Sequence, residues 1–356
     1  MHAAPRQSLG NLGVSDVSLP LESAISDACG IVRAELDLVA ARVSALASSA
    51  ADPLGLAAGT LASRRGKLIR PALVLLSARA AGPKGPDPLS RDGPVRDRLL
   101  AAASAFELLH LASLTHDDVL DASTARRGWA STWVTWGVGV AILAGDHLFG
   151  KAVSQAAHAG PRALRSLCRT IDALLAGQAA EMSAVGSPLG RRAYLSLATA
   201  KTAVFSSECC AVGAGIGGAG SAAAAGLRRY GRALGQAYQL VDDLLDWTGD
   251  PSRMGKPGLS DLVAGRLTYP VIAGLARRPR RVGRCLEGLR ECRSEERPGL
   301  LERLAYELDQ CGALAETLEC AAARTERAVA CLEVLPEGLA RRGLESLALS
   351  LVSREC

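Results

Sequence analysis

Two aspartate clusters of identical spacing are the residues of this sequence whose types and positions best suit chemistry. The first is DDVLD at 117–121, and the second is DDLLD at 242–246. Each follows an apolar run with helical spacing, so the first and last aspartates of a cluster should share one helix face. Like charges at this spacing destabilise a helix, and burial without a counter-ion adds to the penalty. Because magnesium combines one or two carboxylates with substrate phosphates, the repeat predicts magnesium-bridged binding of a diphosphate.

Lysines and arginines in other segments suit the same anionic ligand. Lys67 and Arg70 lie three residues apart in GKLIRP (66–71) and should share a helix face. Further candidates are Arg126 and Arg127 after the first cluster, Lys201 beside Thr202, and Lys256 after the second cluster. Any one of them alone is most simply a surface charge, but several of them beside two aspartate clusters favour a phosphate site.

The composition excludes several other classes of protein. The 356 residues are 49% apolar and 22% charged, as in globular rather than disordered proteins. A net charge of +5 is too small to indicate nucleic-acid binding, and the basic segment 277–284, expected as a loop between helices, has no interleaved aromatics. The ten cysteines form no CxxC pair or zinc-type cluster, which favours free thiols in a reducing compartment.

Neither a membrane span nor a targeting segment is expected. The apolar stretch at 133–145 is shorter than the about 20 residues that a membrane helix needs. The first twenty residues lack the basic and then apolar pattern of a signal peptide. We therefore expect a cytoplasmic enzyme or binding protein.

The elements that position the candidate residues should be helices throughout. From Leu19 onward, apolar residues recur at three- and four-residue spacing, whereas no segment alternates with period two over β-branched residues. One predicted buried stripe comprises Ile25, Cys29, Val32, Leu36, Val39 and Val43. Residues 1–18 are polar and predict a flexible tail, and residues 19–356 predict one domain.

Six ordered motifs over residues 21–351 resemble those of the trans-type (all-E) polyprenyl diphosphate synthases. They are GKLIRP at 66–71, ELLHLASLTHDDVLDASTARRG at 107–128, LAGDHL at 143–148, AKTAVF at 200–205, GQAYQLVDDLLDWTGD at 235–250 and GKPGLSDLVAGRLTYP at 255–270. The resemblance implies an all-α, single-domain isoprenoid synthase fold with about ten or more helices around a central cavity. It also implies a homodimer in which each cavity has the two aspartate motifs facing each other at its mouth.

The resemblance assigns roles to individual residues by motif position. Asp117 and Asp121 would bind two magnesium ions and Asp242 another, about three ions per site. The remaining catalytic assignments are Asp118, Asp243 and Asp246 as supporting groups, with Asp261 beside them, and Lys201. Isopentenyl diphosphate would be held by Lys67, Arg70, His110 and Arg127, and the allylic diphosphate by Arg126, Lys201, Thr202, Gln239 and Lys256. Two departures are Arg266, where the family often has lysine, and Gly177-Gln178, where many members have Gly-Glu.

The implied reaction joins isopentenyl diphosphate head-to-tail to an allylic diphosphate such as farnesyl or geranylgeranyl diphosphate. The allylic C–O bond breaks to give a carbocation, magnesium and fixed cations stabilise the leaving diphosphate, and the isopentenyl double bond attacks the cation. The released diphosphate is the expected base for the final proton. The site must exclude water, because water would trap the cation.

Product length should depend on the helix before the first aspartate cluster. Ala112 and Ser113 are small where short-chain members commonly have an aromatic, so Leu109 and then Phe106 are the next candidate wall residues. The helix from 106 to 117 rises about 16 Å, which predicts a product of roughly thirty carbons or more, with roughly twenty to twenty-five carbons as the alternative. Release of so apolar a product would involve transient membrane association.

Two other functions remain open. A class I terpene cyclase shares the first aspartate motif, but its second motif is normally of an Asn/Ser/Glu type and it lacks the Lys67 and Arg70 site. A non-catalytic subunit of a heteromeric synthase usually lacks one aspartate motif. Because both motifs are intact here, the sequence favours an active synthase.

Overall fold

The computed structural model describes residues 21–352 except 65, 83–86, 91, 127, 188, 249–261, 263–264 and 294. The fold is all-α, as predicted. Within the described residues, β structure is limited to a two-residue hairpin of β1 (Ala125–Arg126) and β2 (Trp129–Ala130), in which Ala125 pairs with Ala130. The predicted tail at 1–18 lies outside the described residues.

The helices of the first half are α1 (Leu21–Gly30), α2 (Arg33–Ala47), α3 (Leu54–Ser63), α4 (Ile69–Ala81), α5 (Pro94–Leu120), α6 (Thr132–Trp136), α7 (Val138–Ala159) and α8 (Pro161–Ala184). Those of the second half are α9 (Arg191–Ala198), the π-helical turn η1 (Thr199–Ala203), α10 (Val204–Ile216), α11 (Ser221–Thr248), α14 (Tyr269–Arg277), α15 (Pro279–Glu291), α16 (Arg297–Gln310), α17 (Ala313–Ala330) and α18 (Leu339–Val352).

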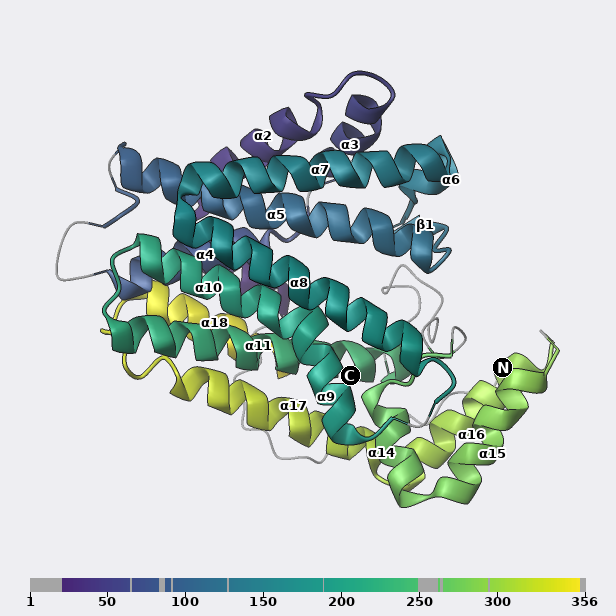
Figure 1. Ribbon diagram of the computed structural model, residues 1–356. Helices are drawn as coiled ribbons and strands as arrows, with labels where there is room; N and C mark the ends of the chain where they lie inside the picture. Colours follow the sequence, from purple (N-terminus) through teal and green to yellow (C-terminus); the bar gives the residue numbers. More distant parts are fainter. Residues whose placement is uncertain are drawn as a thin grey trace.

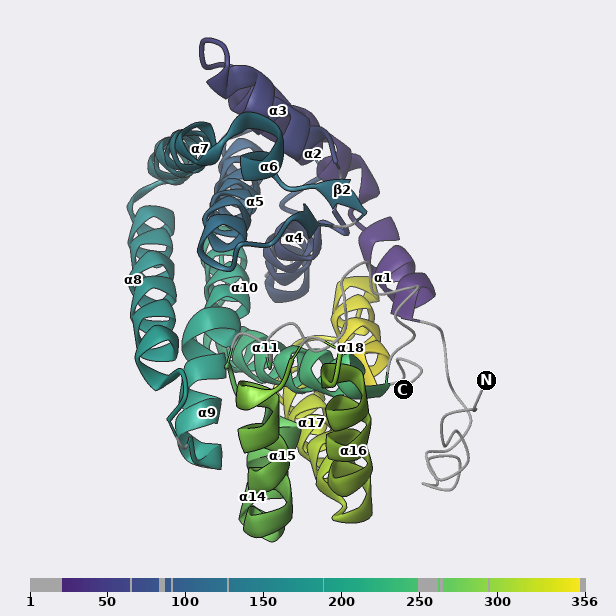
Figure 2. The same ribbon diagram turned by 90° about the vertical axis from the view of Figure 1, so that its right-hand side faces the viewer.

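The two helices that carry the aspartate clusters, α5 and α11, occupy different layers of the molecule (Figures 1 and 2). α5 packs against α7 and α4, and α11 packs against α10 and α17. α4 and α10 lie against each other and so join the two layers. Each cluster is at the C-terminal end of its helix, so these ends carry the carboxylates.

Helix α5 is the centre of the core. By length and composition it could span a membrane, but 78% of its most apolar stretch is buried inside the fold. That burial is the pattern of a core helix of a folded domain. A smaller cluster of buried residues surrounds α14 and includes Tyr194, Tyr269 and Leu304. α11 contributes side chains to both clusters, which fixes its C-terminal half beside α9 and α14.

Local expectations are mostly confirmed, with one clear error. All six residues of the stripe from Ile25 to Val43 are buried, although the helix is interrupted between α1 and α2. The loop predicted at 277–284 is wrong, because α14 ends at Arg277 and α15 begins at Pro279. Proline is well accommodated at the first position of a helix, where its missing N–H has no intrahelical partner to lose.

Candidate active site

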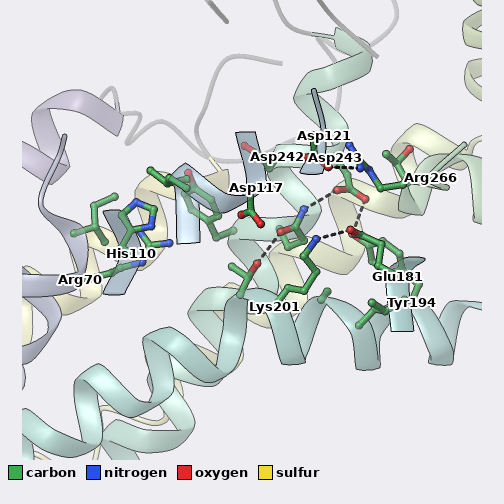
Figure 3. A pocket seen from close by; sticks show the side chains of 18 of the residues that line it. Arg70, His110, Asp117, Asp121, Glu181, Tyr194, Lys201, Asp242, Asp243 and Arg266 are labelled. Carbon is green, nitrogen blue, oxygen red and sulfur yellow. Dashed lines mark hydrogen bonds and ion pairs between the residues drawn. The ribbon is translucent and has the colours of Figure 1, made fainter. Parts of the chain in front are cut away.

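A cavity of about 770 Å³ is lined by residues from both aspartate clusters and from the cationic segments (Figure 3). The predicted residues that line it are Lys67, Arg70, His110, Asp117, Asp121, Arg126, Lys201, Thr202, Gln239, Asp242 and Asp243. Arg127, Lys256 and Asp261 lie outside the described residues. The structure therefore brings together predicted residues that are up to 176 positions apart in sequence, as Lys67 and Asp243 are.

One face of α5 supplies the first wall. Glu107, His110, Leu114 and Asp117 line the cavity at the three- and four-residue spacing of a helix. Asp121 follows directly after the last residue of α5, and its N–H donates to the Asp117 carbonyl oxygen at 2.8 Å. Asp117 and Asp121, the two predicted metal ligands of this cluster, thus face the same cavity from the end of the helix.

The environment of Asp117 favours a bound cation. Burial raises the pKa of its carboxyl group above the ordinary value, and the neighbouring Asp121 raises it further, while Lys201 and Arg126 lower it. Two carboxylates that repel each other in a partly buried site gain most from a divalent cation placed between them.

Asp118 is buried behind the cavity wall and does not face the cavity. It is 2% exposed and does not line the cavity. Its Oδ1 accepts a hydrogen bond from Arg126 Nε at 2.7 Å, and Arg126 Nη2 lies 2.6 Å from the same oxygen in an ion pair. This position is compatible with the supporting role predicted for Asp118: the side chain holds Arg126, and Arg126 reaches the cavity.

The second cluster divides differently from the first, in which Asp117 and Asp121 line the cavity and Asp118 does not. Asp242 lines the cavity, whereas Asp246 is half-buried one turn further along α11 and is not among the described residues that line it, so its supporting role stays a prediction. Asp243 lines the cavity but is 4% exposed. It accepts hydrogen bonds from the Tyr194 hydroxyl (2.5 Å), the Tyr269 N–H (2.7 Å) and Gln239 Nε2 (3.0 Å).

Burial raises the pKa of Asp243 to about 7, and the three donors lower it less than burial raises it. All three donors are neutral, so the hydrogen-bond partners of this carboxylate among the described residues supply no counter-charge. The bond from Gln239 Nε2 fixes the amide, because Gln239 Oε1 accepts from the Thr202 hydroxyl at 2.9 Å. Gln239 is therefore held at both ends of its amide group.

Lys201 and Thr202 lie in the π-helical turn η1 between α9 and α10. Such turns interrupt the α-helical register and occur frequently at functional sites. Lys201 Nζ pairs with Glu181 Oε2 of α8 at 2.5 Å. Glu181 lines the cavity as well, so α8 contributes a carboxylate that the sequence prediction does not include.

Two glycines let neighbouring helices approach this turn. A Cβ at Gly177 of α8 would lie 2.8 Å from Lys201 Cγ, and a Cβ at Gly235 of α11 would lie 2.5 Å from Ala203 Cα. Real Cβ atoms essentially never come within 3.0 Å of another heavy atom. The unexplained Gly177-Gln178 segment thus has a packing role at Gly177, where it places η1 close to α8.

The Arg70 side chain is positioned by an aromatic ring. Its guanidinium lies 4.8 Å from the ring centroid of Phe205, in cation–π geometry. His110 packs edge-on against the same ring at 6.3 Å. Leu68, between Lys67 and Arg70, has a φ of 50°, a left-handed conformation that costs about 1 kcal/mol or more for a residue other than glycine. This backbone strain lies directly in the predicted diphosphate-binding segment.

Several residues of the cavity are not among those predicted from the sequence. Arg266 lines it and donates to Asp121 Oδ1 at 2.7 Å, so the arginine at this departure from the family pattern joins the two halves of the site. The signal for it is present in the sequence, because Arg266 keeps the positive charge of the lysine that the family often has at this motif position. No local pattern indicates Glu181 or Tyr194, because their partners Lys201 and Asp243 come from other helices.

The structure does not bring the four predicted wall residues to the cavity. Phe106, Leu109 and Ala112 are at most 2% exposed, Ser113 is half-buried, and none of them lines the described space. Phe106 instead packs edge-on against Phe205 at 5.9 Å. Phe205 thus contacts Phe106 on one side and Arg70 and His110 of the cavity wall on another.

Three cavity carboxylates fit the predicted magnesium ligands: Asp117, Asp121 and Asp242 are oxygen donors that project from two different helices. Among the described residues, no three His, Cys, Asp or Glu side chains are close enough to hold an ion by themselves. A magnesium ion here would therefore need substrate phosphate or water oxygens as well, which is its usual coordination in phosphate-binding enzymes.

Comparison with known proteins gives the class that this fold and cavity define. A sequence model of the polyprenyl synthetase family matches residues 53–304. Geranylgeranyl diphosphate synthase of Mycobacterium tuberculosis is 35% identical over 303 residues, which cover 83% of this chain and 82% of that protein. Heptaprenyl diphosphate synthase component 2 of Geobacillus stearothermophilus is 37% identical over 228 residues, or 63% of this chain and 67% of that protein.

A solved structure agrees. The polyprenyl synthase from Caulobacter crescentus, complexed with calcium and isoprenyl diphosphate, superposes with a TM-score of 0.84 at 30% identity, covering 93% of this chain and 98% of that one. The chain therefore belongs to the polyprenyl synthetase family. It is an enzyme, a prenyltransferase of the polyprenyl diphosphate synthase class.

Proposed function

We propose that this enzyme condenses isopentenyl diphosphate with an allylic diphosphate to make a long-chain all-trans polyprenyl diphosphate, using magnesium. The observation that carries the proposal is the convergence of Asp117, Asp121 and Asp242 with Lys67 and Arg70 on one cavity. Carboxylates alone would repel a diphosphate. With divalent cations between them and fixed cations beside them, the same cavity binds one.

The metal ligands in this proposal are Asp117, Asp121 and Asp242. Magnesium bound there would neutralise the diphosphate and stabilise the negative charge that develops as it leaves. Arg126, held by Asp118, and Lys201, held by Glu181, are fixed cations that would contact the same leaving group. Such preorganised charges stabilise a transition state effectively because they need no reorganisation during the reaction.

The other substrate would bind on the opposite side of the cavity. Lys67 and Arg70 would hold the diphosphate of isopentenyl diphosphate, with the Phe205 ring fixing the Arg70 guanidinium. The carbon–carbon bond would form between the two substrates as the allylic C–O bond breaks. The proton lost from the isopentenyl unit would go to the released diphosphate.

An assay of the purified protein alone tests this function. We expect chain elongation from isopentenyl and farnesyl diphosphates with magnesium, and none after chelation of the metal. A cyclic hydrocarbon from the allylic substrate alone would instead indicate a terpene cyclase. No product until a partner is added would indicate a heteromeric subunit, for which the similarity to a heptaprenyl synthase component is the supporting observation.

We infer a product of roughly thirty carbons or more on the basis of the small side chains at Ala112 and Ser113 and the helix rise behind them. The relatives include both geranylgeranyl and heptaprenyl synthases, so the roughly twenty- to twenty-five-carbon product stays the alternative. Chromatography of dephosphorylated radiolabelled products distinguishes them, and a dominant product of roughly fifteen carbons would exclude both. Ala112→Phe should shorten the product if the chain passes this residue.

We also propose that the enzyme is a homodimer that buries apolar residues of α7 and α8. On α8, Cys168, Leu175 and Met182 recur every seven residues and are all exposed, Leu175 by 66%. A stripe with this spacing suits helix–helix packing. Light scattering should give twice the chain mass for the wild type and the single mass for Leu175→Arg with Met182→Arg. Leu339→Arg, at an equally exposed leucine of α18, should leave the mass unchanged.

A further inference from the structure

A second cavity, of about 420 Å³, lies between α15 and α16. It is lined by Arg281, Arg284, Cys285, Leu300, Arg303 and Glu307. None of these residues lines the catalytic cavity. α15 and α16 lie together at the end of the molecule away from α5, in the lower part of Figure 2. The two cavities are therefore separate sites.

The lining of this cavity is cationic. Its three arginines and one glutamate give a formal charge of +2. Glu307 is 7% exposed and already accepts hydrogen bonds from Arg278 at 3.2 Å and Arg281 at 3.5 Å. In the part of the chain that the structure describes, Arg284 and Arg303 form no ion pair, and Arg284 Nε donates only to the Arg280 carbonyl oxygen.

Nothing else in the lining neutralises these charges. α15 begins at Pro279 and has no acidic residue in its first turn, so the positive end of the helix adds to the arginines. Cys285 is 4% exposed, and burial raises the pKa of its thiol above the ordinary value. The thiol is therefore neutral and supplies no negative charge. Arg281, Arg284 and Arg303 are exposed, so solvent screens their mutual repulsion, and an anion bound between them would relieve the repulsion that remains.

We propose that this cavity binds a phosphate or diphosphate anion from solution, with Arg284 and Arg303 as its principal ligands. Guanidinium groups suit phosphate oxygens because their paired N–H donors match the spacing of two oxygens. Arg281 completes the site from the same helix as Arg284. The proposal does not depend on the proposed function, because it uses no residue of the catalytic cavity.

Hydrogen exchange of the full-length protein, followed by mass spectrometry of its peptides, tests the site directly. With chelator present, inorganic phosphate or pyrophosphate should slow exchange in peptides of α15 and α16 in a saturable manner. In Arg284→Gln with Arg303→Gln, the affinity derived from this protection should fall about tenfold or more, because two charge-assisted contacts are lost. Activity in phosphate-free buffer should stay unchanged in this variant.

The matched control removes the same charge elsewhere: Arg293→Gln with Arg342→Gln alters two exposed arginines that do not line the cavity. It should keep the protection. A single Arg303→Gln variant serves if the double variant unfolds. Unchanged protection in a folded Arg284/Arg303 variant would overturn the proposal. So would protection by vesicles of phosphatidylcholine and phosphatidic acid without protection by the inorganic anions, because the ligand would then be a membrane surface.

Discussion

The two aspartate clusters have the same sequence pattern but different support. In each, the first aspartate lines the cavity and the second is buried, Asp118 by 98% and Asp243 by 96% of its surface. Asp118 is held by a single charged partner, the Arg126 guanidinium. Asp243 is held by three neutral donors, from Tyr194, Tyr269 and Gln239. Identical spacing thus places the first aspartate of each cluster on the cavity, while the tertiary surroundings decide how the second one is stabilised.

This difference has a consequence for how each wall is built. Asp118 and Arg126 are eight residues apart, so the first wall is a local unit of the end of α5 and the hairpin that follows. The donors of Asp243 come from α9 and α14, so the second wall depends on three helices being in place. The first wall should therefore be sensitive to loss of one charge, and the second to loss of packing between helices.

The largest expected effect is loss of a cavity-facing aspartate in either cluster. Asp117→Ala and Asp242→Ala should each lower kcat/KM by about a hundredfold or more, because each removes a proposed metal ligand that stabilises the leaving diphosphate. Circular dichroism should show an intact fold. Asp172→Ala, at an exposed residue of α8, is the control and should be fully active. Near-normal activity in either cavity variant would refute the site.

Substitution of the two buried aspartates should lower the free energy of unfolding by different amounts. Asp118→Asn leaves the partly buried Arg126 without its counter-charge and should lower the free energy of unfolding by about 3 kcal/mol. Asp243→Asn keeps an oxygen acceptor for neutral donors and should cost about 1 kcal/mol. Urea unfolding of both variants at the same pH measures the two values. Equal costs, or the reverse order, would show that the kind of partner does not set the cost.

An ion pair behind the second aspartate cluster predicts a pH-dependent contribution to the stability of the fold. Glu316 pairs with Arg191 at 2.6 Å, and the Tyr269 hydroxyl lies 3.4 Å from the same carboxylate oxygen. The hydrogen bond from Arg191 lowers the pKa of Glu316 below its ordinary value of 4.5. Because the folded pKa is the lower one, this pair stabilises the fold above pH 4.5, and the stabilisation is lost as pH falls through the folded pKa.

Glu316→Gln should therefore lower the free energy of unfolding at pH 7 by about 1 kcal/mol, and its difference from wild type should shrink below pH 4.5. Urea titrations across this range measure it. Glu345→Gln, which removes a partly buried pair with Arg341 four residues earlier within α18, is the control and should cost about 0.5 kcal/mol or less. A difference from wild type that is constant with pH would contradict the assignment of the effect to this ion pair.

The sequence predicts well what depends on local periodicity. The stripe from Ile25 to Val43 is buried, and the first aspartate of each cluster lines the cavity, because helical spacing determines which residues share a face. The error at 277–284 has a local cause as well: Pro279 begins a helix here instead of interrupting one. The motif pattern also gives the fold class, because the same six segments occur in order.

What the sequence could not give is the choice of distant partners. Tyr194 is 49 residues from Asp243, and Arg266 is 145 residues from Asp121, so no local pattern connects them. The π-helical turn at Lys201 depends on close approach of Gly177 and Gly235 from two other helices. These contacts follow from packing of the whole fold and are visible only in three dimensions.

The smallest expected effect tests whether the support of the second cluster is shared. Tyr194→Phe removes one of the three donors to Asp243 and keeps the ring that packs edge-on against Tyr269 at 5.4 Å. It should cost about 1 kcal/mol or less and change kcat by less than about twofold, because two donors remain. Tyr306→Phe, at a tyrosine of α16 that is 57% exposed, should change neither quantity. If Tyr194→Phe costs as much as Asp118→Asn, the support of Asp243 is concentrated in one hydroxyl, and the two clusters are alike after all.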